Sequence, residues 1–302
     1  MLTHNKTPFL VANVVEKKNN KVIKKIYYDD LEIKKEKIGP TQCEYCKREF
    51  GRKDTFKRHL KTCRTKIEQE LSLFENHPQH FKEFSIDPTN DEILEMSFPL
   101  PNKERLVMFI CGRNGCGKST FIQKLLKNYI KVYKNRDIYL FSSQEFDDKL
   151  DDKFDNLSRI NLDETFVEEP LELNDLRNSI CIFDDVDAIQ NKKVKSSVEN
   201  LKYDILKNGR DHTGDRTQDI DIIITNHMTL GGYETKFMIY ESFYYVLFPQ
   251  GTTAHSIETI CKKYAGLDRE QTQKVLKNES RAVIIHKNYP RYVLTDKEIF
   301  LV

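Results

Sequence analysis

The stretch over residues 106–130 limits the possible folds of this chain more than any other. It reads LVMFICGRNGCGKSTFIQKLLKNYI, which is an apolar run, a glycine-rich loop and an amphipathic segment. Its Gly112, Gly117, Lys118 and Ser119 fit the spacing G-x-x-x-x-G-K-[ST] of a phosphate-binding loop. In such a loop the glycines let backbone N–H groups turn onto phosphate oxygens, and the following helix points its positive N-terminal end at the same anion. The sequence therefore predicts a strand, a nucleotide-binding loop and a helix, in this order.

The polar residues of this loop have expected roles in binding ATP. Lys118 is expected to reach the β- and γ-phosphates, and the Ser119 hydroxyl to take one position on Mg²⁺. A chance match in a glycine turn is the alternative, but the flanking strand and helix patterns are the context that a true motif requires. The residues predicted to bind the nucleotide are Gly112, Arg113, Asn114, Gly115, Cys116, Gly117, Lys118, Ser119 and Thr120.

The segment Ser179–Asp187, SICIFDDVD, is predicted to be the Walker B strand of the same site. Asp184 is expected to hold Mg²⁺ through the water shell of the ion, and Asp185 to polarise the attacking water. Many motor ATPases carry Glu at the second position, and Asp is one methylene shorter, so its reach toward the water is shorter. A pair of acids that caps the end of a strand is the alternative interpretation.

After Pro101 the sequence alternates between strand and helix patterns, which predicts an α/β fold with a mainly parallel sheet between helices. Most strand candidates are continuous apolar runs, as expected for strands that are covered on both faces. Residues 145–175 hold twelve acids against three bases and are predicted to be a solvated insertion or helix surface. The expected strands are Leu106–Cys111, Ile138–Phe141, Ile180–Asp184, Ile220–Thr225, Phe243–Phe248 and Ala282–His286, and the expected late helices are His255–Ala265 and Asp268–Glu279.

The order of these strands indicates an ATPase rather than a simpler nucleotide-binding protein. One strand, 138–141, separates the two Walker strands along the chain, and the next, 220–225, ends in Thr225-Asn226-His227. This layout is typical of ATPases that place a polar sensor at the tip of the strand after Walker B. Asn226 is the sensor candidate, and His227 ranks second because a histidine at a loop end is more often only solvated.

Arg210 and Arg216 lie in the polar loop before this strand. They are candidates for an arginine finger that one subunit supplies to the ATP of its neighbour. The alternative is that each guanidinium faces only solvent, as arginines in polar loops usually do.

A cysteine cluster near the N-terminus predicts a zinc site. Its ligands would be Cys43, Cys46, His59 and Cys63, spaced C-x₂-C-x₁₂-H-x₃-C, as in tetrahedral zinc sites. Phe50 and Phe56 stand where a small ββα unit has its two core rings, and Zn²⁺ binding would supply most of the folding energy. The cluster closely resembles a zinc finger of the two-Cys, two-His type in which Cys63 replaces the last His. A coincidental set of buried cysteines is the alternative.

The charge distribution is consistent with a nucleic-acid partner at this end of the chain. Residues 1–70 hold 18 Lys and Arg against 10 Asp and Glu, although the whole chain carries only +2. Arg52, Thr55 and Arg58 would form the helix face of the finger that meets base edges. One finger covers only about three base pairs, so non-specific DNA contact or a protein interface is an equally good interpretation.

Composition also bears on compartment and domain organisation. Seven cysteines, an odd number, indicate a reducing compartment, and neither a signal peptide nor an apolar run of about 20 residues is present. The runs FLVANVV and KVIKKIYY could form a hairpin. The predicted divisions are a basic arm over 1–40, a zinc finger over 41–64, a linker over 65–101 and a P-loop ATPase domain over 102–302.

The order of motifs in the last two thirds of the chain resembles a known family. GRNGCGKST, CIFDDVD and NGRDH…DIIITNH, followed by YYVLFP, KKYAGLD and HKNYP, are similar to the packaging ATPases of large nucleocytoplasmic DNA viruses, poxviruses and giant viruses among them. These belong to the FtsK-like clade of ring-forming DNA motors. The resemblance implies an ATP-driven translocase that packages double-stranded viral DNA into capsids as a homo-oligomeric ring. It also implies contact with capsid proteins, and a location in the virus factory of the host cytoplasm or in the virion.

The sequence departs from the family pattern in two places. The segment TGDRTQD expands the loop around Arg210, and a zinc finger with a basic arm is not expected throughout the family. Two rival interpretations stay open. A P-loop kinase for a small molecule would lack the strand inserted between the Walker strands. A zinc-finger DNA-binding protein without catalysis would not need an intact Gly117-Lys118-Ser119 or Asp184.

Overall fold

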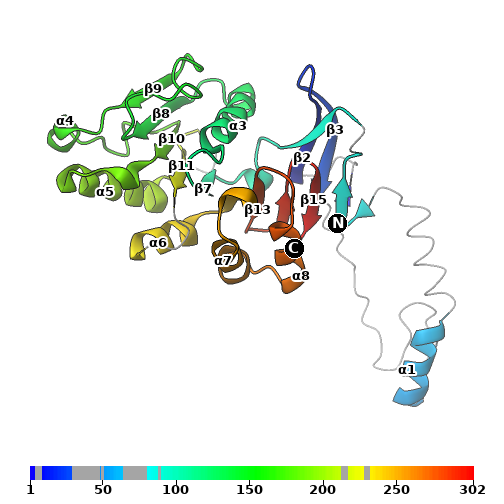
Figure 1. Ribbon diagram of the computed structural model, residues 1–302. Helices are drawn as coiled ribbons and strands as arrows, with labels where there is room; N and C mark the ends of the chain where they lie inside the picture. Colours follow the sequence, from blue (N-terminus) through cyan, green and yellow to red (C-terminus); the bar gives the residue numbers. More distant parts are fainter. Residues whose placement is uncertain are drawn as a thin grey trace.

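The computed structural model describes residues 1–3, 9–28, 48, 51–63, 80–87, 90–211, 217–227 and 232–302. A ten-stranded sheet in the order β5-β15-β14-β13-β12-β7-β11-β10-β8-β9 forms the centre of the molecule (Figure 1). From β9 to β12 the neighbouring strands run parallel, and from β12 to β5 they run antiparallel. This arrangement confirms the predicted α/β fold with a mainly parallel sheet between helices.

All six expected strands are present, and the last of them joins the antiparallel part of the sheet. Every residue of β7, β10 and β12 is buried, as their continuous apolar runs predict. The parallel strands are β7 Val107–Cys111, β8 Asp137–Ser142, β9 Leu157–Ile160, β10 Ser179–Asp184, β11 Ile220–Asn226 and β12 Tyr244–Leu247. The antiparallel strands are β13 Val283–His286, β14 Tyr292–Leu294, β15 Glu298–Leu301 and β5 Glu83–Ser85.

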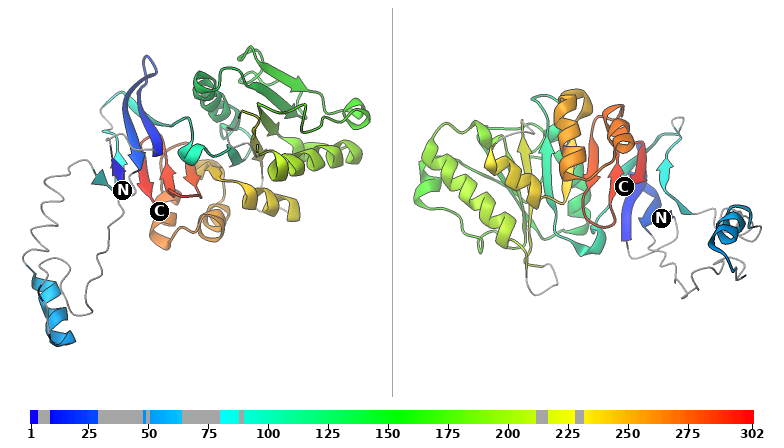
Figure 2. Two further views of the ribbon diagram at one scale, coloured as in Figure 1. Left: turned by 180° about the vertical axis from the view of Figure 1, so that it is seen from behind. Right: turned by 90° about the horizontal axis from the view of Figure 1, so that it is seen from below.

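Helices cover both faces of this sheet (Figures 1 and 2). The side chains of β7 alternate, so Phe109 packs with α4 to α8 on one face and Ile110 packs with α3 on the other. The helices expected over 255–265 and 268–279 are present; the first continues from α7 into a π-helical turn over Ile260–Tyr264. The helices around the sheet are α3 Lys118–Val132, α4 Glu164–Glu168, α5 Lys192–Asn208, α6 Tyr233–Glu241, α7 Ala254–Thr259 and α8 Arg269–Leu276, with 3₁₀ turns at Pro101–Lys103, Val186–Ala188 and Pro249–Gly251.

A second, five-stranded sheet in the order β4-β1-β3-β2-β6 is built from the N-terminal part of the chain. Its antiparallel pair β2 and β3 confirms the hairpin expected from FLVANVV and KVIKKIYY. Buried residues of this sheet, among them Val14, Leu94 and Met96, share one apolar core with α3. The strands are β1 Leu2–Thr3, β2 Phe9–Glu16, β3 Lys21–Tyr28, β4 His80–Phe81 and β6 Glu92–Met96.

The expected basic arm over 1–40 and the expected linker over 65–101 both include strands. The described residues of both ranges form strands: β6 pairs with β2, and β5 pairs with β15 at the edge of the large sheet. Two prolines lie near the end of the second range. Pro99 follows β6, and Pro101 opens the 3₁₀ turn that leads directly toward β7, because proline is well suited to the first position of such a turn.

The acidic segment over 145–175 is more integrated than the expected solvated insertion. It contributes β9 to the sheet, and Phe154 and Phe166 are buried. Arg159 forms a two-pronged ion pair with Asp151, so some of the excess negative charge is compensated inside the segment. In the part of the chain that the structure describes, no helix is both long and apolar enough to cross a membrane.

Candidate nucleotide-binding site

The glycine-rich loop lies at the carboxyl end of β7, between the strand and helix that the sequence predicts. The N–H of Gly112 donates to the carbonyl of Asn226 at 3.2 Å, which ties the loop to the tip of β11. The N–H of Arg113 donates to the carbonyl of Gly251 at 3.4 Å. Lys118 is the first residue of α3, so the N-terminal end of this helix points into the loop, as a phosphate site requires.

Two glycines of the loop are required by geometry. Gly117 has φ +111°, a conformation that L-residues with a side chain rarely adopt, and a Cβ there would lie 2.7 Å from Nε of Arg281. A Cβ on Gly112 would lie 2.5 Å from Sγ of Cys116. Glycine is thus required at position 117 by the backbone conformation, and at position 112 by the close approach of the Cys116 side chain.

The Lys118 side chain is held inside the loop. It is buried, and its Nζ donates to the Gly112 carbonyl at 3.0 Å. The same Nζ lies 3.3 Å from Nδ1 of His227 and 3.9 Å from Oδ1 of Asp185. One buried ammonium group therefore faces the loop, the tip of β11 and the second Walker B acid together.

Asp184 ends β10 with only 3% of its surface exposed. Burial raises the pKa of its carboxyl to about 6, although the hydrogen bond from Oγ1 of Thr225 to Oδ1, at 2.7 Å, acts in the opposite direction. A buried carboxylate whose charged form is this costly fits a cation, because a divalent ion offsets the lost hydration. Asp184 and the half-buried Ser119 of α3 line the same cavity, so these residues fit the predicted Mg²⁺ site.

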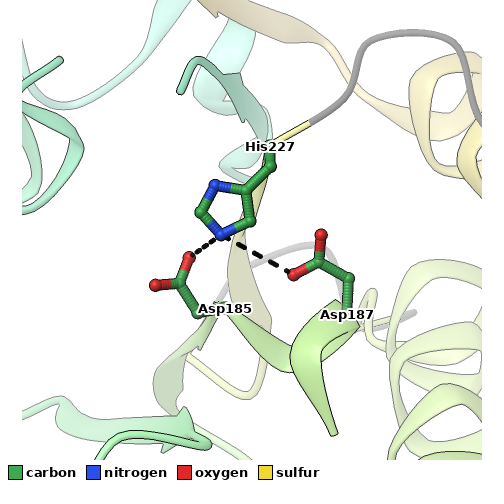
Figure 3. A group of neighbouring side chains, drawn as sticks. All are labelled: Asp185, Asp187 and His227. Atoms are coloured by element: carbon green, nitrogen blue, oxygen red, sulfur yellow. Dashed lines mark ion pairs between the residues drawn. The ribbon is translucent and has the colours of Figure 1, made fainter. Parts of the chain in front are cut away.

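Asp185 follows in the left-handed region, at φ +51°, which Asp tolerates better than most residues. Its Oδ2 accepts a hydrogen bond from Nε2 of Gln144 at 2.6 Å. Its Oδ1 lies 2.8 Å from Nε2 of His227, and a dashed line marks this ion pair in Figure 3. Its backbone N–H donates to Oγ1 of Thr225 at 3.2 Å. Strands β8 and β11, on either side of β10, thus fix the second acid from two directions.

The donors and acceptors around His227 define its tautomer. The ammonium group of Lys118 can only donate, so Nδ1 of His227 accepts and the ring proton lies on Nε2. Nε2 lies 2.8 Å from Oδ1 of Asp185, but no hydrogen bond joins these two atoms. A continuous polar network therefore runs from the Gly112 carbonyl through Lys118, His227 and Asp185 to Gln144.

Asp187 completes a group of three potential metal ligands with Asp185 and His227 (Figure 3). One ligand atom from each residue lies within 4.8 Å of the others, and Oδ1 of Asp187 lies 4.0 Å from Nε2 of His227. Oδ1 of Asp185 and Oδ1 of Asp187 are buried and accept no hydrogen bond from the residues that the structure describes, so the imidazole lies close to both carboxylates without a hydrogen bond to either.

Three residues of the site escaped the sequence analysis. Gln144 follows the tip of β8, where the run Ser-Ser-Gln was a polar signal that could have been used. Thr225 stands inside the Thr-Asn-His tip and connects both Walker B acids. Arg281, whose Nε donates to the Cys116 carbonyl at 2.8 Å, comes from the loop before β13, and no motif marks it.

The remaining candidates have mixed positions. Asn226 supports the loop through its backbone carbonyl, whereas His227 places its side chain in the network. Arg210 is exposed and follows α5 near Gly209, whose carbonyl accepts from the N–H of Ile220 at the start of β11. The amino end of β11 lies on the side of the sheet opposite the carboxyl end of β7, where the glycine-rich loop begins. Arg210 therefore does not join the site of its own chain. Arg216 lies outside the described residues.

The expected zinc ligands are described only in part. Helix α1 spans Lys53–Thr62, carries His59 in its last turn and is followed by the buried Cys63. Cys43 and Cys46 lie outside the described residues.

Comparison with known proteins agrees with this geometry. Residues 90–201, which include the glycine-rich loop and the Walker B acids, match the family model described as the Rad17 P-loop domain. The order of strands in the sheet agrees with this match, because β11 lies between β7, which leads into the glycine-rich loop, and β10, which ends in the Walker B acids. The fold is that of a P-loop NTPase.

Individual proteins that resemble this chain share less than a third of its residues over the matched part. The uncharacterized protein V3 of Sputnik virophage is 29% identical over 202 residues, which is 65% of this chain and 77% of that protein. The genome packaging NTPase B204 of Sulfolobus turreted icosahedral virus 2, solved with ATP-gammaS, has 14% identity and a TM-score of 0.39 over 64% of this chain and 98% of that one. The cytoplasmic domain of the type VII secretion ATPase EccC of Thermomonospora curvata has 11% identity and a TM-score of 0.45 over 71% of this chain and 28% of that one.

Proposed function

We propose that this P-loop NTPase hydrolyses ATP and uses the energy to move double-stranded DNA into a viral capsid. The observation that carries the hydrolytic part is the network at the tips of β7, β8, β10 and β11, in which His227 contacts both Lys118 and Asp185. A carboxylate fixed from both sides next to a phosphate-binding loop is the arrangement that orients a water molecule for attack.

Each residue of the network has a stated part in this proposal. Lys118 binds the β- and γ-phosphates, and Mg²⁺ held by Ser119 and Asp184 would neutralise the charge that develops on the γ-phosphate. Asp185 accepts a proton from the attacking water. His227, with Asn226 beside it, senses the γ-phosphate, because its ring reaches the amine of Lys118. Gln144 and Thr225 position Asp185.

The DNA-translocating part rests on the ordered motifs shared with the packaging ATPases of large DNA viruses. Two of these motifs have structural explanations in this chain. His286, the histidine of HKNYP, is buried with Nε2 at 2.6 Å from Oε1 of Glu104, and it stacks on Tyr244 of YYVLFP with ring centroids 4.5 Å apart. These motifs therefore hold β12 and β13 to the chain that enters β7, where the phosphate-binding loop begins.

The proposal includes an assembly and a set of cofactors. The chain works as a homo-oligomeric ring around DNA and docks on capsid proteins in the virus factory or the virion. Arg210 or Arg216 reaches the ATP of a neighbouring subunit; Arg210 is exposed and lies near the amino end of β11, away from the glycine-rich loop of its own chain. Cys43, Cys46, His59 and Cys63 bind one Zn²⁺, and this finger contacts DNA or the docking partner.

The rate of ATP hydrolysis with and without long duplex DNA tests this proposal. Strong stimulation by DNA supports the motor. Turnover that requires a small acceptor molecule would select a kinase, although the position of β11 between the Walker strands argues against one. If ATP is hydrolysed neither with nor without DNA, the protein binds nucleotide but does not catalyse its hydrolysis.

A further inference from the structure

A second cavity adjoins the phosphate-binding loop. It has a volume of about 170 Å³ and is lined by Gly117, Thr120 and Arg281, which also line the polar cavity that contains Lys118 and the Walker B acids. The two cavities therefore meet at the first turn of α3. Neither Asp184 nor Asp185 lines the second cavity, so it lies beyond the catalytic end of the loop.

The walls of this second cavity differ in chemistry from the phosphate site. They are mainly apolar and come from α3, from β6 of the N-terminal sheet and from the ends of β12 and β13. Phe121 and Phe248 meet edge to face with ring centroids 6.5 Å apart, and Leu94 and Met96 form part of the opposite wall. Polar groups are present as well: Glu95 accepts a hydrogen bond from Nδ2 of Asn128 at 2.5 Å.

We propose that this cavity binds the nucleoside of ATP, so that the N-terminal sheet forms one wall of the nucleotide site. The inference rests on the proposed ATPase function and follows from the direction of the triphosphate. Lys118 and Asp184 fix the γ-phosphate end, and Ser119 and Thr120 follow in the first turn of α3. This order would place the α-phosphate next to Thr120, which lines both cavities.

The chemistry of the walls suits a purine nucleoside. A purine has two apolar faces and a polar edge, and a largely apolar pocket with a few polar groups is the usual site for such a ligand. Aromatic side chains such as Phe121 and Phe248 favour flat rings. Arg281 stands at the junction, where its guanidinium can contact the phosphates or lie over the base.

Binding of ATP and of inorganic tripolyphosphate, each with Mg²⁺, separates the two cavities experimentally. Ala282→Trp fills the cavity from the side of β13, and Ile93→Ala removes apolar surface from the side of β6. We expect each variant to raise the Kd for ATP about tenfold or more and to leave the Kd for tripolyphosphate unchanged. Ile23→Ala is the matched control, since Ile23 belongs to the same N-terminal sheet but is 47% exposed and does not line the cavity.

The outcomes distinguish failure of this inference from failure of the proposed function. Wild-type protein that binds neither ATP nor tripolyphosphate would contradict both. Wild-type protein that binds both equally well, or ATP affinity that is unchanged in Ala282→Trp and Ile93→Ala, would overturn the nucleoside site and leave the phosphate site standing. Because Ile93 is only half-buried, Ile93→Ala still tests the inference if Ala282→Trp fails to fold.

Discussion

Gln144 donates a hydrogen bond from Nε2 to Oδ2 of Asp185 at 2.6 Å, so the tip of β8 holds the acid that follows β10. Parallel strands end at the same edge of a sheet, and β8 and β10 are direct neighbours in the sheet. The amide of Gln144 thus fixes one carboxylate oxygen while the other faces His227.

Gln144→Ala should therefore lower kcat for ATP hydrolysis about tenfold or more, because a carboxylate free to rotate orients water poorly. The KM for ATP should change little, since Gln144 holds the acid and not Lys118. Steady-state kinetics measures both values. Gln190→Ala is the control, because Gln190 is exposed and its amide donates only to the Ala188 carbonyl. A kcat unchanged in Gln144→Ala would remove the positioning role.

The sensor assignment can be tested by comparing neighbours. His227→Ala should lower kcat more than Asn226→Ala, because the His227 ring contacts Lys118 and Asp185 while the Asn226 carbonyl supports the loop through the backbone. His227→Gln should recover part of the lost activity, since its amide can donate to Asp185. Single-turnover hydrolysis measures the effect. A larger loss in Asn226→Ala would return the role to that residue.

Asp184→Asn should make the nucleotide-free protein more stable at pH 7.5. Because the pKa of Asp184 is raised from 3.8 to about 6 in the folded state, its ionised form costs stability above about pH 6, and the cost is absent below about pH 4. Two pKa units correspond to at most about 3 kcal/mol, so the Tm without Mg²⁺ should rise by several degrees.

The same variant should lose stabilisation by Mg²⁺ and ATP. Thermal melts at pH 7.5 and pH 4 measure both effects, with Asp155→Asn as the control because Asp155 is exposed. A Tm of Asp184→Asn below that of the wild type at pH 7.5 would show that the buried charge is compensated in a way that this account omits.

The zinc prediction concerns residues 41–64. Protein purified without chelators should contain about one Zn²⁺ per chain, and His59→Ala should lose it while ATP hydrolysis without DNA is retained. Metal analysis by mass spectrometry measures the content. Full zinc occupancy in His59→Ala would remove this histidine from the ligand set.

The sequence predicted the features that depend on neighbouring residues, and it did not predict those that depend on residues far apart in the chain. Patterns within one segment, such as the loop after β7 or the apolar run of β10, predicted the large sheet and the Walker residues. Asp221 shows the limit: it interrupts the apolar run of β11, and its partners are Arg136 at 2.6 Å, the Tyr129 hydroxyl at 2.7 Å and the Leu106 N–H at 2.7 Å. These partners are 85 to 115 residues away in sequence.

The same limit applies to the site and to the N-terminal sheet. Arg281 reaches the glycine-rich loop from 165 residues away, and no local pattern encodes that contact. The pairing of β5 with β15 joins residues on either side of the whole P-loop fold, so no pattern within the expected linker over 65–101 could predict it. Non-local pairing, and not local propensity, decided both cases.

The network around Asp185 is proposed to cleave ATP, and ATP turnover by three proteins measures whether it does. Wild-type protein should hydrolyse ATP with Mg²⁺. Lys118→Ala should lose turnover, because the cation that follows the γ-phosphate is gone. Asp185→Asn should bind ATP with near-normal affinity and fail to cleave it, so that ATP is recovered intact from the complex. Unimpaired turnover in Asp185→Asn or in Lys118→Ala would contradict the assignment of the site.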